Sequence, residues 1–117
     1  MLGEHPVDVM LLCTDLDEAR RFYGETLGLE EVLAEPDQFV AFRCGDGTRL
    51  AASKSTTGPT TDATQANWRV PDIAAEVADL RAKGVEIDDP IDAGFALVAF
   101  FTDPAGNALG LLQLTAR

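Results

Sequence analysis

Apolar positions near the start of the chain predict a strand followed by a capped helix. Residues 7–13 are apolar apart from Asp8, which is typical of a short strand. Asp15 then stands three residues before Glu18, the spacing of a helix capping box. Behind this cap, one helical face collects the apolar residues Leu16, Ala19, Phe22, Tyr23 and Leu27.

Gly28 is expected to end this helix, because glycine adopts the left-handed conformation that closes a helix. Turn residues at 36–37 and 45–47 then divide the following segment. The predicted strands of this segment are 29–35, 38–43 and 48–54.

The pattern restarts after residues 55–64, a Ser/Thr-rich stretch without periodicity that is typical of a linker. A strand is predicted at 65–70, and a second helix begins at Asp72 and ends at Gly84. The apolar face of that helix is Ile73, Val77 and Leu80. The two capping aspartates, Asp15 and Asp72, lie 57 residues apart, so the chain has an internal repeat of strand, helix and three strands.

The last segment predicts a hairpin. Apolar flanks at 97–102 and 108–114 enclose Asp103-Pro104-Ala105-Gly106. Pro104 fixes its own φ, and Gly106 can supply a left-handed residue at the exit, which favours a tight turn. Ahead of the hairpin we expect a short strand at 85–87 and a loop at 88–94.

Two motifs resemble the vicinal oxygen chelate superfamily, which contains glyoxalases, bleomycin-resistance proteins and extradiol dioxygenases. They are Asp15-Leu-Asp-Glu-Ala-Arg-Arg-Phe-Tyr23 with Leu27-Gly-Leu29, and Asp103-Pro-Ala-Gly-Asn107. The resemblance implies an α+β fold in which two βαβββ modules form a U-shaped, eight-stranded mixed sheet with the helices on its convex face. The length of 117 residues suits a single domain over 1–117, and the internal repeat divides it into modules at 7–54 and 65–114. The resemblance also implies a homodimer.

Metal-dependent members of that superfamily use four inward side chains, one from the first and one from the last strand of each half. Carried over residue by residue, these positions are Asp8, Ala51, Gln65 and Gly110. Alanine and glycine offer no ligand atom, and two oxygen ligands do not make a high-affinity transition-metal site. We therefore expect no metal and no other cofactor. The single histidine, His5, is expected to be exposed, since turning it inward would turn the apolar residues of its strand outward.

Strand alternation from these positions predicts the residues that line the concave face. The predicted ligand pocket consists of Asp8, Met10, Leu12, Arg49, Ala51, Ser53, Gln65, Asn67, Arg69, Gly110 and Leu112. An apolar surface with a few polar groups is typical of a small-molecule site. The small residues Ala51 and Gly110 are expected to leave room where metal ligands would stand.

The charged residues of this face allow two interpretations. Asp8 can pair with Arg49 or with Arg69, and such a pair either meets a ligand or fills the space as a structural ion pair. Trp68 falls on the other face of its strand and is expected to pack beneath the second helix.

Composition limits the partners. The net charge of −11 argues against nucleic acid and anionic membranes, and favours a cationic ligand weakly. No apolar run approaches the ~20 residues of a membrane span, and no signal peptide is expected at the N-terminus. Cys13 and Cys44 both lie in apolar stretches, which favours reduced thiols and a cytoplasmic location.

Three function classes follow from these observations. The one favoured is metal-free binding of a small molecule in the cavity, as in the bleomycin-resistance branch that the chain resembles. The alternative is a metal-dependent lyase, isomerase or dioxygenase, which the fold favours and the ligand positions oppose. A variant with Asp8 as a general base lacks a second catalytic group, so no catalytic residue is assigned. An interaction module without a small ligand is the third.

Overall fold

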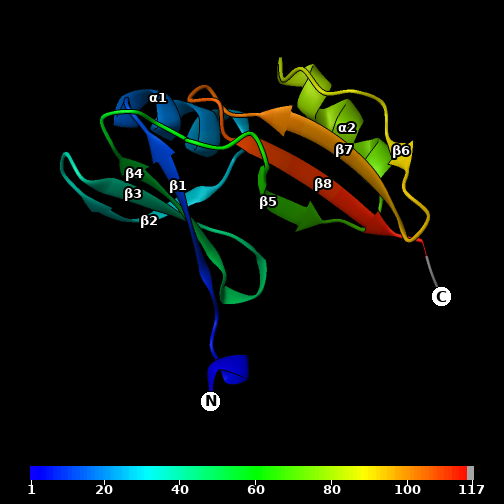
Figure 1. Ribbon diagram of the computed structural model, residues 1–117, viewed down its shortest axis with the longest axis horizontal. Helices are drawn as coiled ribbons and strands as arrows, with labels where there is room; N and C mark the ends of the chain where they lie inside the picture. The colour runs from blue at the N-terminus through cyan, green and yellow to red at the C-terminus, as the bar shows by residue number, and fades with distance from the viewer. Residues whose placement is uncertain (116–117) are drawn as a thin grey trace. The chain divides into compact units, whose positions relative to one another are not determined.

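Each predicted repeat folds as a mixed sheet with a helix against one face (Figure 1). The computed structural model describes residues 1–115, within which eight strands divide into two sheets of four. The predicted α+β fold of two strand-helix-strand-strand-strand halves is therefore confirmed. The chain forms two units, Met1–Thr61 with Pro104–Asn107, and Asp62–Asp103 with the chain from Ala108 onward.

The first sheet has the strand order β1-β4-β3-β2, with β1 parallel to β4 and the other pairs antiparallel. Its strands are β1 (Asp8–Cys13), β2 (Glu30–Glu35), β3 (Phe39–Arg43) and β4 (Arg49–Lys54). Short 3-10 helices, η1 (Leu2–Glu4) and η3 (Gly45–Gly47), lie before β1 and between β3 and β4. These bounds agree with the predicted strands to within one residue at either end.

The helix of the first unit begins as predicted and continues differently. Asp15 caps α1 (Leu16–Arg20), since its Oδ1 accepts a hydrogen bond of 3.1 Å from the Glu18 backbone N–H. The chain then widens into a π-helix, η2 (Arg21–Thr26), in place of the regular helix that apolar spacing predicted. Gly28 follows with a φ of +76°, so its predicted left-handed conformation is confirmed.

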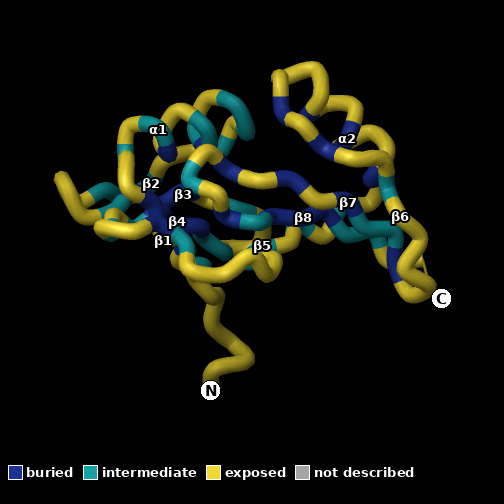
Figure 2. Tube along the Cα trace, turned by 45° about the horizontal axis from the view of Figure 1, so that its top comes forward, coloured by how far each residue is buried: buried dark blue, intermediate teal, exposed yellow. Residues whose placement is uncertain are grey.

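The core of the first unit lies between this helical segment and the sheet. α1 packs against β3 and β4, and Figure 2 shows buried residues concentrated along those strands. The buried side chains on the helix side are Leu11, Cys13, Val40, Phe42, Leu50 and Ala52. Tyr23 is also fully buried, and its ring contacts that of Phe42 with centroids 5.8 Å apart. Hydrophobic burial therefore fixes which sheet face the helix covers.

The second unit repeats this arrangement with the strand order β5-β8-β7-β6, and β5 is parallel to β8. Its elements are β5 (Thr64–Arg69), α2 (Ile73–Ala82), β6 (Ile91–Asp92), β7 (Ala96–Thr102) and β8 (Ala108–Leu114). Asp72 caps α2 through the Ala75 N–H at 3.1 Å, and Gln113 from β8 accepts the Ile73 N–H at 2.8 Å. Both contacts satisfy N–H groups that a helix start leaves unpaired.

The predicted strand at 85–87 is wrong. The third element of the second half is β6, Ile91–Asp92, whereas 85–87 is an irregular segment with Val85 and Ile87 buried. Its alternating burial imitates a strand, but the Ile87 carbonyl accepts hydrogen bonds of 2.7 and 3.1 Å from the Arg81 guanidinium. A side chain of α2 thus takes the place of a neighbouring strand.

The turn between β7 and β8 belongs to the first unit. Gly106 has a φ of +98°, as the turn chemistry predicted. The buried Asn107 side chain donates a hydrogen bond of 2.8 Å to the Leu12 carbonyl of β1.

Within residues 1–115, no helix is long and apolar enough to cross a membrane.

Candidate functional site

The face of the first sheet opposite α1, here called the open face, is built from three register rows across the strands. The rows run from β1 through β4 and β3 to β2. A β-bulge at Val32 shifts the register of β2, so that Leu33 and Glu35 lie on the same face as Glu30. The rows are Asp8–Arg49–Arg43–Glu30, Met10–Ala51–Ala41–Leu33 and Leu12–Ser53–Phe39–Glu35. The predicted pocket residues of β1 and β4 therefore do lie side by side on one face.

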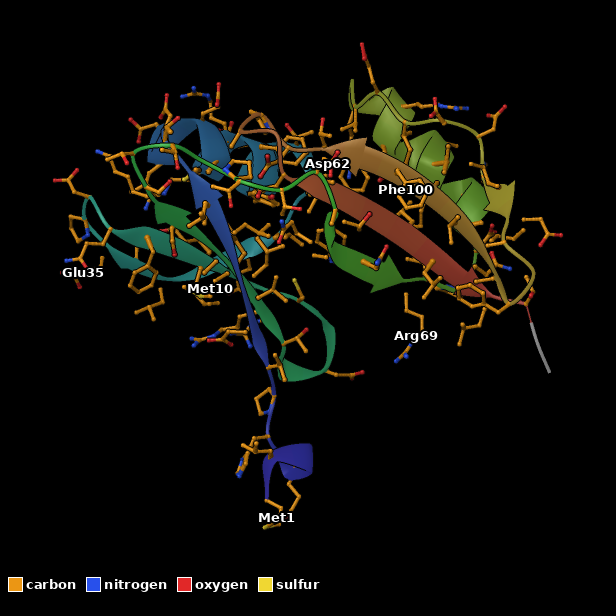
Figure 3. The ribbon with its side chains drawn as sticks, in the orientation of Figure 1. Met1, Met10, Glu35, Asp62, Arg69 and Phe100 are labelled. Carbon is orange, nitrogen blue, oxygen red and sulfur yellow. The ribbon has the colours of Figure 1, made fainter. Side chains whose placement is uncertain are left out.

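Apolar side chains occupy the middle of this open face. Met10, marked in Figure 3, is 57 % exposed, Leu33 is 46 % exposed and Leu12 is also exposed. Ala41 and Ala51, on the two central strands between Met10 and Leu33, are buried. Exposed apolar residues gathered on one face mark an interaction surface more often than scattered ones do.

Asp8 pairs with Arg49. Nε and Nη2 of Arg49 donate to Oδ1 and Oδ2 of Asp8 at 3.1 and 2.7 Å, a two-pronged contact that joins β1 to β4. These hydrogen bonds lower the pKa of Asp8 and raise that of Arg49, so the pair remains ionised at neutral pH. Arg69 is exposed and extends away from the ribbon at the end of β5 (Figure 3).

A second ion pair completes the same row, and sequence reasoning missed it. Nε of Arg43 in β3 donates to Oε1 of Glu30 in β2 at 3.0 Å. The open-face residues of β2 and β3 were absent from the predicted pocket because that prediction extended only the four implied ligand positions. The alternation of 39–43, joined to β4 through the turn at 45–47, is the signal that could have found them.

The second sheet also has an open face, opposite α2, and this face carries the remaining predicted residues with one exception. Asn67 lies opposite Gly110, and Arg69 opposite Leu112, across the parallel pair β5 and β8. Gln65 falls at a register shift between Thr64 and Ala66, so a bulge interrupts the alternation that placed it with Asn67 and Arg69. Trp68 lies on the helix side as predicted, stacked on Phe101 with centroids 6.2 Å apart.

The expectation of room at Gly110 is not met, because the Asn67 side chain fills that space. A Cβ atom built on Gly110 would overlap Oδ1 of Asn67 and would lie 3.3 Å from its Cγ. The same Cβ would approach the Ala99 carbonyl oxygen to 3.4 Å. Any side chain at 110 therefore requires Asn67 to move.

The four implied ligand positions do not fit a metal ion. Both carboxylate oxygens of Asp8 are held by Arg49, Ala51 ends in a methyl group, and Asn67 covers Gly110. Among residues 1–115, no cluster of three or more His, Cys, Asp or Glu side chains could hold such an ion. The donor set is thus poorer than any transition-metal site requires.

Comparisons with known proteins agree with this architecture. The sequence model of the Glyoxalase/Bleomycin resistance protein/Dioxygenase superfamily matches residues 5–111, and no curated protein matches in sequence. TnmS3, an antibiotic binding protein from Streptomyces sp. CB03234, is a similar solved structure, with a TM-score of 0.81 and 28 % identity over 95 % of this chain and 96 % of its own.

Two further structures extend the comparison. A glyoxalase/bleomycin resistance protein from the same Streptomyces strain has a TM-score of 0.76 and 27 % identity over 93 % of this chain and 100 % of its own. Lactoylglutathione lyase from Agrobacterium tumefaciens has a TM-score of 0.76 at 21 % identity, over 93 % and 92 % respectively, which is a likeness of fold alone. Because the superfamily match spans most of the chain and the fold agrees with it, the protein belongs to the glyoxalase/bleomycin resistance protein/dioxygenase superfamily.

Proposed function

We propose that this protein binds a small apolar molecule without a metal, and that the open face of the first sheet makes the main contact. The observation that carries the proposal is the combination of exposed apolar side chains on that face with ligand positions that cannot hold an ion. Met10 contributes a flexible, polarisable side chain, which adapts well to ligands of irregular shape.

The similarity to TnmS3 supports this proposal, since that protein is an antibiotic binding protein and shares 28 % identity with the chain. Binding without turnover also suits the open face, where Arg49 already holds the carboxylate of Asp8 that a general base would need. A metal-dependent lyase, isomerase or dioxygenase remains the alternative that a metal titration decides. A homodimer and a cytoplasmic location, both expected from the sequence, stay part of the proposal.

Fluorescence of N-phenyl-1-naphthylamine, an uncharged apolar dye, tests the binding face. We expect the chelator-treated protein to bind the dye, and Met10→Lys to weaken binding about tenfold or more, because it places a charge among the apolar rows. Leu2→Lys is the matched control, since Leu2 is an exposed apolar residue outside the sheet.

Equal dye affinity in the wild type and in Met10→Lys would contradict the proposed face. Dye binding that appears only after a metal is added would contradict the metal-free part of the proposal. Thermal unfolding of both variants checks that each remains folded.

A further inference from the structure

The row Asp8–Arg49–Arg43–Glu30, here called the charge row, borders the apolar middle of the open face. Arg49 and Arg43 are register partners on the two central strands, whereas Asp8 and Glu30 stand on the edge strands. Two like charges directly opposite one another repel, and each arginine instead pairs outward with its acidic neighbour. The cationic groups thus stand at the centre of the row and the anionic groups at its margins.

The ion pairs leave hydrogen-bond donors on both arginines. A guanidinium carries five N–H groups in a fixed fork. The bonds to the carboxylates use Nε and Nη2 of Arg49 but Nε alone of Arg43. Both arginine side chains are partly exposed, at 38 % for Arg49 and 60 % for Arg43. Further N–H groups are therefore available to an acceptor that reaches the centre of the row.

The acidic residues of the row are less suited to hold a ligand. Both oxygens of Asp8 already accept hydrogen bonds from Arg49, and one oxygen of Glu30 accepts from Arg43. The apolar row Met10–Ala51–Ala41–Leu33 adjoins the charge row, and Arg43 and Arg49 lie two positions from Ala41 and Ala51 along the same strands. The geometry nearest the apolar surface thus favours an acceptor, despite the net charge of −11.

We propose that the ligand is an apolar molecule bearing an acidic group, and that Arg49 and Arg43 hydrogen-bond to that group while the body of the molecule covers the apolar rows. This inference rests on the proposed function and adds the chemical class of the ligand. A carboxylate or sulfonate supplies two or more acceptor oxygens, which match the planar fork of arginine.

Two dyes that differ in an acidic group test the inference. 1-Anilinonaphthalene-8-sulfonate carries a sulfonate on the same kind of aromatic body as the uncharged N-phenyl-1-naphthylamine. Each is titrated against the wild type and against Asp8→Asn/Arg49→Gln, which removes both charges together and leaves no unpaired ion. The titrations use about 0.15 M salt, at which the net charge is screened beyond ~8 Å.

We expect the double variant to bind the sulfonate dye about tenfold more weakly and the uncharged dye with unchanged affinity, since charge-assisted hydrogen bonds are lost. Glu30→Gln/Arg43→Gln should act in the same direction. Arg20→Gln/Glu31→Gln is the matched control: it removes a similar two-pronged pair, with bonds of 2.6 and 3.2 Å, and Glu31 lies in register with the helix-side residue Phe42. It should change neither dye affinity.

The remaining outcomes separate this inference from the proposed function. If the sulfonate dye keeps its affinity, or both dyes lose affinity equally, the acidic ligand class is wrong while binding to the apolar face stands. If the uncharged dye does not bind the wild type at all, both proposals fail.

Discussion

Replacing Phe42 with alanine is expected to lower the free energy of unfolding by about 3–5 kcal/mol, the range for large-to-small changes of a buried aromatic residue. Phe42 is fully buried, and its ring contacts that of Tyr23. The cavity would open between β3 and the π-helix η2, where a Cβ atom added to Gly24 would lie 3.5 Å from the Phe42 ring. Urea unfolding measures the change directly.

Phe100→Ala is the matched control for this prediction. Phe100 lies on the open face of the second sheet and is 46 % exposed, so its truncation should cost less than ~1.5 kcal/mol. A similar loss in the two variants would mean that the helix side of the first sheet is not the core described above.

Replacing Gly110 with alanine is expected to destabilise the protein by about 1–3 kcal/mol through overpacking. The new methyl group would overlap Oδ1 of Asn67 and would lie 3.4 Å from the Ala99 carbonyl oxygen. The φ of Gly110 lies outside the left-handed region, so the loss arises from lack of space and not from backbone strain.

A double-mutant cycle with Asn67→Gly isolates this contact. Gly110→Ala should cost much less when Asn67 is already glycine, because the overlapping carboxamide is gone. Equal costs in the two backgrounds would show that Asn67 does not fill the space above Gly110.

Local sequence chemistry was sufficient to predict most of the helices and strands, whereas the pairing of two modules was implied by the family resemblance. Asp15 and Asp72 cap the two helices because a short side chain with an oxygen acceptor can reach the first-turn N–H groups. Gly28 and Gly84 end the helical segments with positive φ. Gly106 also has a positive φ, in the turn between β7 and β8. Each of these signals depends on a residue and its immediate neighbours, which is why the sequence alone reveals it.

Features that depend on the pairing of distant segments could not be predicted in this way. The bulge at Gln65 is a property of the pairing of β5 with β8, in which Thr64 and Ala66 lie opposite consecutive residues of β8. The irregular segment at 85–87 is held by hydrogen bonds from the Arg81 side chain to the Ile87 carbonyl. A single contact of this kind produces no periodic pattern in the sequence. The π-helix keeps apolar residues at spacings that also fit a regular helix, so the pattern does not distinguish the two.

The candidate site was predicted in part for the same reason. Asp8, Met10, Arg49 and Ala51 share one face, as predicted by alternation from the two ligand positions that the resemblance implied in these strands. The charge row needs the antiparallel register of β3 with β4 and of β2 with β3, which brings Arg43 beside Arg49. That register follows from tertiary structure and not from any one strand.

Thermal unfolding of the chelator-treated protein, with and without Ni²⁺, Zn²⁺, Mn²⁺ or Fe²⁺, tests the central claim most directly. A metal that binds only the native state, present at a concentration 100 times its dissociation constant, adds about 2.7 kcal/mol to the free energy of unfolding. This raises the melting temperature of a domain of this size by several degrees. We predict no shift with any of these ions, because Asp8 is held by Arg49 and Asn67 covers Gly110. A reproducible shift of several degrees with one ion would contradict metal-free binding and would favour a metal-dependent enzyme.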